Sequence, residues 1–132
     1  MADSNEIAYF AGFFDGEGSI GIYKKKYVVC VVQCDPRPLN RMKEIWGGNI
    51  YVQTKMKATH RSKYIWQTHG LEARPFLSDV LPFLRVKKEQ AEIYLSVLGI
   101  TPRGRGTSAQ KHAANVVAIA ARKLMELKRE VF

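Results

Sequence analysis

The stretch Tyr9-Phe10-Ala11-Gly12-Phe13-Phe14-Asp15-Gly16-Glu17-Gly18 sets the architecture that we expect for this chain. Ala8, Gly12 and Gly16 recur at every fourth position, so they share one face of a helix. Each glycine costs a helix roughly 1 kcal/mol relative to alanine, which indicates that another helix approaches this face closely. The three phenylalanines cover the other sides and are expected to anchor the helix in a core. The stretch therefore predicts a helix that ends at an acidic pair set among glycines.

Residues 10–18 resemble the nine-residue signature of the LAGLIDADG homing endonucleases. Gly16 keeps the small character of its position, and Glu17 keeps the acid but replaces the commoner aspartate. The outright matches are Ala11, Gly12, Asp15 and Gly18, and the apolar ones are Phe10, Phe13 and Phe14. Residues 81–91 also resemble the family's Pro-Phe-Leu-x-x-Lys-x-x-Gln-Ala stretch. The resemblance thus extends over about residues 7–98.

The composition limits the class of protein. The chain has 132 residues, of which 46% are hydrophobic, and this length fits one ordinary domain with its own core. Cys30 and Cys34 have no second pair, which favours a reducing compartment over a disulfide framework or a zinc site. No apolar run approaches the length of a membrane span, so we expect no membrane partner. The acidic residues 1–6 are unlike a signal peptide; we expect a protein that is not secreted, in an organelle matrix or a prokaryotic cytoplasm.

Positive charge is concentrated in one part of the chain. The formal net charge is +9, and residues 19–70 hold ten Lys and Arg against two acids, Asp35 and Glu44. A surface this one-sided attracts polyanions, although a basic surface is also compatible with simple solvation. The ten residues are Lys24, Lys25, Lys26, Arg37, Arg41, Lys43, Lys55, Lys57, Arg61 and Lys63.

The hydrophobic pattern predicts an alternation of helices and paired strands. We expect a helix up to about residue 15, strands at 19–27 and 27–33, a helix at 39–46, strands at 49–56 and 63–68, and helices at 71–81, 87–98 and 108–129. Asp3, with Glu6 three residues later, predicts an N-terminal cap. Pro75 and Pro82 are expected to interrupt the helix at 71–81.

The predicted fold class is α+β, with a four-stranded antiparallel sheet backed by helices. The resemblance implies the same architecture, an αββαββα homing-endonuclease fold with a curved sheet. We expect a single domain over residues 1–132, in which residues 4–98 form the core and residues 99–132 form a basic loop and a C-terminal helix.

The third and fourth strands alternate in polarity, so their faces can be assigned. Tyr64 and Trp66 are expected to face the core, as are Val52, Thr54 and Met56 on the neighbouring strand. The opposite face carries glutamines and lysines, which suit the base edges and phosphates of a major groove. The predicted contacts to double-stranded DNA are Tyr23, Lys24, Lys25, Lys26, Arg37, Gln53, Lys55, Lys57, Arg61, Lys63 and Gln67.

Hydrolysis of a phosphodiester needs a nucleophilic water and stabilisation of negative charge, both of which divalent ions supply. Mg²⁺ is held by one or two carboxylates together with waters and phosphate oxygens. The resemblance assigns metal binding to Glu17, with the backbone carbonyl of Gly16 as a further ligand. We expect Mg²⁺ as the cofactor, Mn²⁺ as a substitute, and Ca²⁺ to support binding without cleavage. Alternatively, Glu17 is a solvated acid at a helix end. We interpret Asp15 as a helix-end residue, with a direct role in metal binding as the less favoured alternative.

Three further residues are candidates for catalysis together with Glu17. The resemblance places Gln33 where related enzymes position the water network, Arg37 near the scissile phosphate, and Lys87 where a lysine contacts the active site. A lysine can stabilise phosphoryl charge or perturb the pKa of nearby solvent groups. The alternatives are a polar strand end, a surface arginine and a lysine that extends into solvent at a helix start.

One copy of the signature per chain implies a second chain. Packing two such helices about a two-fold axis brings two Glu17 carboxylates together and implies a near-palindromic target. The interface candidates are Ala8, Ala11, Gly12, Asp15 and Gly16. The leading hypothesis is a homodimeric, site-specific endonuclease that cuts double-stranded DNA and, by resemblance, serves the mobility of an intron. The alternatives on the same fold are a non-cleaving DNA-binding regulator and an RNA-binding intron maturase.

Overall fold

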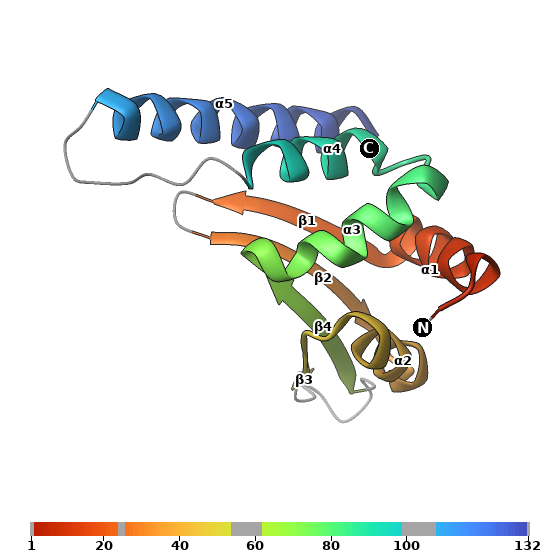
Figure 1. The fold of residues 1–132 in the computed structure, drawn as a ribbon. Helices are drawn as coiled ribbons and strands as arrows, with labels where there is room; N and C mark the ends of the chain where they lie inside the picture. Colours follow the sequence, from red (N-terminus) through yellow and green to blue (C-terminus); the bar gives the residue numbers. More distant parts are fainter. Residues whose placement is uncertain (1, 24–25, 54–61, 99–107, 132) are drawn as a thin grey trace.

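The structure, a computed structural model, describes residues 2–23, 26–53, 62–98 and 108–131 (Figure 1). In chain order the elements are α1 (Ser4–Glu17), β1 (Gly18–Tyr23), β2 (Lys26–Gln33), α2 (Pro36–Trp46), β3 (Asn49–Gln53), β4 (Lys63–His69), the 3-10 helix η1 (Gly70–Ala73), α3 (Arg74–Val80), the 3-10 helix η2 (Leu81–Phe83), α4 (Lys88–Val97) and α5 (Ser108–Val131). The predicted α+β class is confirmed. None of the described helices combines the length and the apolar character that a bilayer span requires.

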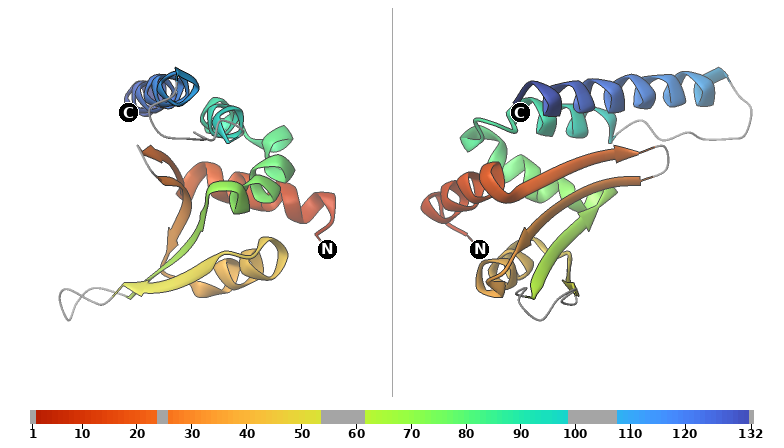
Figure 2. Two further views of the ribbon diagram at one scale, coloured as in Figure 1. Left: turned by 60° about the vertical axis from the view of Figure 1, so that its left-hand side comes forward. Right: turned by 180° about the vertical axis from the view of Figure 1, so that it is seen from behind.

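The four strands form one antiparallel sheet in the order β1-β2-β4-β3. Helices α1, α2 and α3 lie on one side of this sheet, while α4 and α5 lie beside β1 at its edge (Figures 1 and 2). The opposite side of the sheet, which we call the outer face, carries the residues that point away from α1 to α3. The sheet therefore has one face in the core and one face that these three helices leave uncovered.

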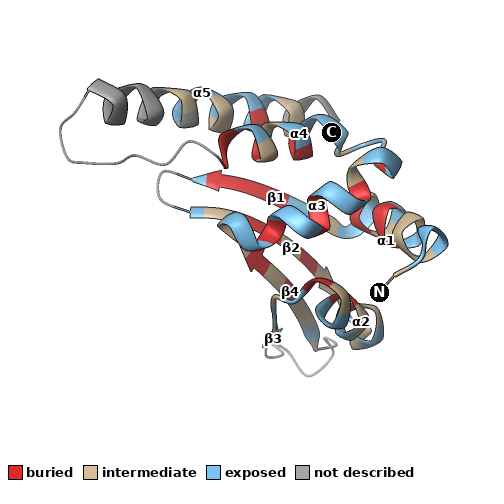
Figure 3. Ribbon diagram, in the orientation of Figure 1, coloured by how far each residue is buried: buried red, intermediate tan, exposed pale blue. Residues whose placement is uncertain are grey.

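The core sits between the sheet and the helices and is rich in aromatic rings (Figure 3). Phe76 on α3 meets the rings of Phe14, Trp46 and Trp66 edge to face at centroid distances of 5.1, 4.8 and 5.1 Å. Trp66 is fully buried and its indole nitrogen donates to the Gly47 carbonyl at 2.8 Å. The predicted inward orientation of Trp66 is thus confirmed.

Several element boundaries differ from those predicted, each for a local reason. α1 continues through Gly16 to Glu17, because the glycine is tolerated within the last turn. α2 begins at Pro36, within the stretch predicted to be a loop, since a proline at the first helical position lacks only an N–H that would have no helical partner. The predicted interruption of the helix at 71–81 is confirmed, because η1, α3 and η2 replace one continuous helix, and Pro75 and Pro82 are each the second residue of a new element. The capping prediction at Asp3 is confirmed, because its carboxylate accepts the Glu6 N–H at 2.8 Å.

β3 also departs from the expectation for the sheet. Ile50 packs against the core, but Val52, which the alternation places on the same side, is 64% exposed. Its pairing with Tyr64 keeps Val52 in the predicted inner row, but the inner side of β3 is covered at Ile50 and not two residues farther along the strand. Thr54 and Met56, which the sequence assigned to the same inner row, lie outside the described residues.

Candidate active site

Helix α1 has two unlike faces. Phe10, Ala11 and Phe14 are buried in the core, whereas Tyr9 is 57% exposed and Gly12 and Gly16 are also exposed. A Cβ atom added at Gly12 or at Gly16 would meet no neighbouring atom within 4 Å in the part of the chain that the structure describes. Packing within the described chain therefore does not require glycine at either position.

The residues predicted for a dimer interface divide between these faces. Gly12 and Gly16 lie on the exposed face, and Ala8 and Asp15 are half-buried beside it. Ala11 is fully buried in the core of the chain and does not lie on the exposed face. The exposed surface of α1 is thus defined by Tyr9, Gly12 and Gly16.

Glu17 is the last residue of α1, and its side chain is exposed. Gly18 follows in extended conformation and starts β1 directly, with its N–H donating to the Phe14 carbonyl. A Cβ atom at Gly18 would lie 2.1 Å from Cδ1 of Phe14, so only glycine fits this turn without a shift of the aromatic ring. The close turn at Gly18 fixes where the Glu17 carboxylate leaves the helix.

Asp15 joins α1 to the segment that precedes α4. Its carboxylate accepts the backbone N–H groups of Arg85 at 2.8 Å and Lys87 at 3.0 Å. In return, the Lys87 ammonium donates to the Asp15 backbone carbonyl at 2.6 Å. Both carboxylate oxygens of Asp15 are therefore engaged in holding Lys87 beside the end of α1, which is a structural role.

A cavity of about 300 Å³ lies between Glu17 and Lys87. Residues 15–19, the start of α4 with Lys87 and Gln90, and Lys128 of α5 line it. Burial lowers the pKa of the Lys87 ammonium; the Asp15 and Glu17 carboxylates oppose this shift, and the Lys128 ammonium adds to it. The structure thus brings Glu17 and Lys87 together at one cavity, although the two residues are far apart in sequence.

The cavity contains two residues that sequence reasoning missed. Gln90 is 4% exposed, and its Oε1 has no hydrogen-bond partner among the described residues. Gln90 belongs to the second segment that resembles the family, so a signal for it existed. Lys128 lies near the end of a long amphipathic helix, and no local pattern distinguishes it from the other lysines there.

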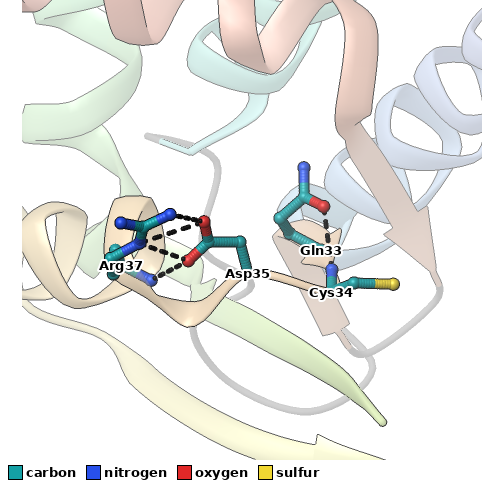
Figure 4. A network of polar contacts seen from close by, with 4 residues as sticks. All are labelled: Gln33, Cys34, Asp35 and Arg37. Atoms are coloured by element: carbon teal, nitrogen blue, oxygen red, sulfur yellow. Dashed lines mark hydrogen bonds and ion pairs between the residues drawn. The ribbon is translucent and has the colours of Figure 1, made fainter. Parts of the chain in front are cut away.

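Gln33 and Arg37 are not among the residues that line this cavity. Both make hydrogen bonds to near neighbours in sequence (Figure 4). The amide oxygen of Gln33 accepts the backbone N–H of Cys34 at 2.8 Å. The exposed Arg37 guanidinium forms a forked pair with Asp35, with Nη2 at 2.6 Å from Oδ2, and this hydrogen bonding lowers the pKa of Asp35 to about 2. Asp35 also caps α2 by accepting the Arg37 N–H.

The outer face of the sheet carries the described strand residues that the sequence assigned to DNA contacts, whereas Arg37 lies on α2. Strand register pairs Tyr23 with Lys26 at one end and Gln53 with Lys63 at the other. Gln67 lies between them, paired with residues of both β2 and β3. Tyr23, Lys26, Gln53 and Lys63 are exposed and Gln67 is half-buried. The remaining sheet candidates, Lys24, Lys25, Lys55, Lys57 and Arg61, lie outside the described residues.

A metal ion would find few protein ligands within one chain. No group of three or more His, Cys, Asp or Glu side chains in the described ranges could hold an ion. Because Asp15 is engaged by backbone N–H groups, the Glu17 carboxylate and the Gly16 carbonyl are the remaining donors at the end of α1. This small set fits Mg²⁺, which keeps several waters and also uses phosphate oxygens, if a second chain brings a second carboxylate.

Comparison with known proteins identifies the fold. The homing endonuclease I-CvuI, solved on the I-CreI target with 2 mM Mg, superposes with a TM-score of 0.72 at 20% identity over 93% of this chain and 82% of that one. The archaeal intron-encoded homing endonuclease I-Vdi141I, complexed with DNA, also has a TM-score of 0.72, at 19% identity and 96% and 86% coverage. The homing endonuclease I-TnaI gives 0.60 at 18% identity and 98% and 96% coverage.

A second group of matches differs in length. A point mutant of I-SmaMI superposes with a TM-score of 0.58 at 16% identity, and this chain covers only 43% of it. I-SmaMI bound to cleaved DNA is described as a LAGLIDADG homing endonuclease. No family model matches the sequence, and no curated protein matches it.

Proposed function

We propose that this chain, which has the fold of the LAGLIDADG homing endonucleases, is a site-specific DNA endonuclease that acts as a homodimer. One observation carries the proposal. α1 presents an exposed face with two glycines that the described chain does not require, and this face leads directly to Glu17 beside the Lys87 cavity. A surface that lets backbones approach closely and that ends at an acid suits a shared active site.

Pairing two chains through α1 supplies what one chain lacks. A close approach at Gly12 and Gly16 would place the two copies of Glu17 near each other, and two neighbouring carboxylates repel unless cations offset their charge. The length of the solved matches supports this pairing. This chain covers most of I-Vdi141I but only 43% of the I-SmaMI mutant, as expected if a dimer of this chain corresponds to one such longer chain.

Each residue of the site has a distinct proposed role. Glu17 and the Gly16 carbonyl hold Mg²⁺, which when bound supplies an activated water and stabilises charge on the phosphate. Lys87, fixed by Asp15, stabilises the negative charge that develops on the phosphoryl oxygens. Gln33 and Arg37 take part only if DNA draws them away from Cys34 and Asp35, so we assign them to the bound state.

The outer face of the sheet provides the binding surface for DNA. Gln53, Gln67 and Lys63 stand on it at alternate positions of β3 and β4, and such donors and acceptors suit base edges and phosphates in the major groove. A two-fold dimer extends this surface symmetrically. The expected target is therefore a long, near-palindromic duplex with cuts at its centre.

Selection of cleaved sites from a randomised duplex library tests the proposal. With Mg²⁺ or Mn²⁺ we expect recovery of a near-palindromic sequence, and with Ca²⁺ we expect retention of that sequence without cleavage. Sequence-specific retention with no cut in any metal would instead indicate a DNA-binding regulator. Retention of intron RNA and not of duplex DNA would indicate a maturase.

A further inference from the structure

Helix α5 brings a second lysine into the cavity beside Glu17. Its Leu124 is 2% exposed, and Val116 and Ala120 also pack against the core. α5 lies alongside α4 and contacts β1 (Figures 1 and 2). Lys128 follows Leu124 by four residues, so both lie on one side of the helix. The anchored helix thereby directs Lys128 to the cavity that Glu17 and Lys87 also line.

Lys128 has no anionic partner of its own within the described part of the chain. None of the ion pairs there includes it. Its near neighbour Cys30 is opposite Ser19 in the sheet, and burial raises the pKa of the Cys30 thiol, which keeps it neutral. Burial lowers the pKa of the Lys128 ammonium. A charged group is thus held partly out of water without compensation from the protein.

The other charges around the cavity do not supply this compensation. The Asp15 carboxylate accepts two backbone N–H groups, and Lys87 donates to the carbonyl of the same residue. Only the exposed Glu17 carboxylate remains, and the proposed function assigns it to a metal ion. Two ammonium groups therefore face one cavity, and each disfavours the charged state of the other.

Gln90, in the first turn of α4, also lines the cavity. Its amide oxygen is buried and lacks a partner among the described residues. The lining of the cavity thus includes two lysine side chains, Lys87 and Lys128, together with Gln90.

We propose that Lys128 binds a backbone phosphate of the DNA in this cavity, so that α5 completes the active site that α1 and α4 begin. The inference rests on the proposed function and extends it to one phosphate and one residue. A phosphodiester carries one negative charge. This charge would compensate the positive charge of Lys128 and offset the repulsion between the Lys128 and Lys87 ammonium groups. α5 is then part of the catalytic machinery, beyond its packing against the core.

Three variants in the full-length protein test this assignment. Lys128→Met keeps most of the apolar stem and removes the charge, Lys128→Arg keeps the charge, and Lys123→Met removes an exposed charge from the same helix. The first readout is the slope of log K against log salt for a mixed-sequence duplex in Ca²⁺. The second is the single-turnover cleavage rate of a selected site in Mg²⁺, and thermal unfolding checks that each variant is folded.

We expect Lys128→Met to reduce the salt slope by about 0.9 for each copy of the chain on the duplex. Its cleavage rate should fall about tenfold or more at saturating protein. Lys128→Arg should restore the slope, and Lys123→Met should match the wild type in both readouts. A wild-type slope in a folded Lys128→Met protein, or an equal loss in Lys123→Met, overturns the proposal.

The experiment distinguishes a failure of the proposed endonuclease function from a failure of the role proposed for Lys128. If the wild-type protein never cuts, the endonuclease function is wrong, yet the salt slope still decides whether Lys128 contacts phosphate. If the wild type cuts and Lys128→Met keeps the wild-type slope, the function stands and the role given to Lys128 is wrong.

Discussion

The two faces of α1 obey different rules. On the inner face, Phe14 is fully buried and lies 5.1 Å from Phe76, and the neighbouring Gly18 leaves no room for a Cβ atom. On the exposed face of α1, Gly12 and Gly16 are surrounded by open space within the described chain. Packing within the chain explains the residues on the inner face of α1, but it does not explain the glycines on its exposed face.

This contrast teaches how to separate structural from functional glycines. Gly18 is required because the Phe14 ring occupies the space that a side chain would need. Gly12, in the interior of α1, costs the helix about 1 kcal/mol relative to alanine, and no contact in the described chain offsets this cost. A close partner outside the chain provides the missing reason, and Glu17 lies where that partner would meet the cavity.

The largest effect is expected at Glu17, the residue at the end of the exposed face of α1. Glu17→Gln removes the proposed metal-binding charge, and metal ions contribute several kcal/mol to such reactions, so cleavage should fall about a thousandfold or more. DNA affinity in Ca²⁺ should stay within about an order of magnitude, because the sheet is unchanged. Single-turnover cleavage and equilibrium binding measure the two effects. A Glu17→Gln protein that cuts at the wild-type rate shows that the site lies elsewhere.

The next largest effect contrasts one aromatic residue from each face. Phe14→Ala leaves a cavity beside Phe76 and should lower the free energy of unfolding by about 3–5 kcal/mol. Tyr9→Ala, its matched control, removes a ring that is 57% exposed and should cost the isolated chain less than about 1 kcal/mol. Urea unfolding of protein dilute enough to be monomeric compares them. Equal losses would contradict the distinction between the faces.

A smaller effect is expected from a matched pair of glycine substitutions. Gly12→Ala should stabilise the isolated chain by up to about 1 kcal/mol, because its Cβ meets open space. In a tight helix pair the added methyl costs about 1–3 kcal/mol, which raises the dimer dissociation constant roughly tenfold or more. Gly18→Ala should instead destabilise the isolated chain, because its Cβ would overlap the Phe14 ring.

Sedimentation equilibrium measures the dimer dissociation constant of each glycine variant, and urea unfolding measures the stability of the isolated chain. The comparison predicts that Gly12→Ala weakens association while strengthening the monomer. If Gly12→Ala leaves the dimer dissociation constant unchanged, or if the wild-type chain is a monomer on DNA, the exposed face of α1 is not a dimer interface.

The sequence predicted features that depend on residues close together in the chain better than features that depend on distant residues. Local patterns were sufficient for the Asp3 cap and for the inward orientation of Trp66, because both depend on residues a few positions apart. The spacing of small residues located Gly12 and Gly16 on one helix face. It could not separate Ala11 from them, because an alanine suits a buried core position as well as a helix contact.

The candidate site depends on contacts that no local pattern contains. The Asp15 carboxylate accepts the backbone N–H of Lys87, 72 positions away. This contact gives Asp15 a structural role, where the sequence predicted only a residue at the end of a helix. Lys128 reaches the cavity because α5 packs along α4 and β1. The family resemblance predicted a site role for Lys87, whereas only the folded chain shows that α5 lies there as well.

The smallest effect distinguishes the outer face of the sheet from its helical side. Lys63 is exposed on β4 opposite Gln53, and Lys43 is exposed on α2, which lies on the other side of the sheet. Lys63→Ala should reduce the slope of log K against log salt by about 0.9 for each phosphate that Lys63 neutralises, whereas Lys43→Ala should leave it unchanged. Both variants lower the net charge equally, so a difference between them reports position and not total charge. Equal slopes for the two variants would mean that the DNA does not lie on the outer face, and the active site at the end of α1 would then have to be reached from another side.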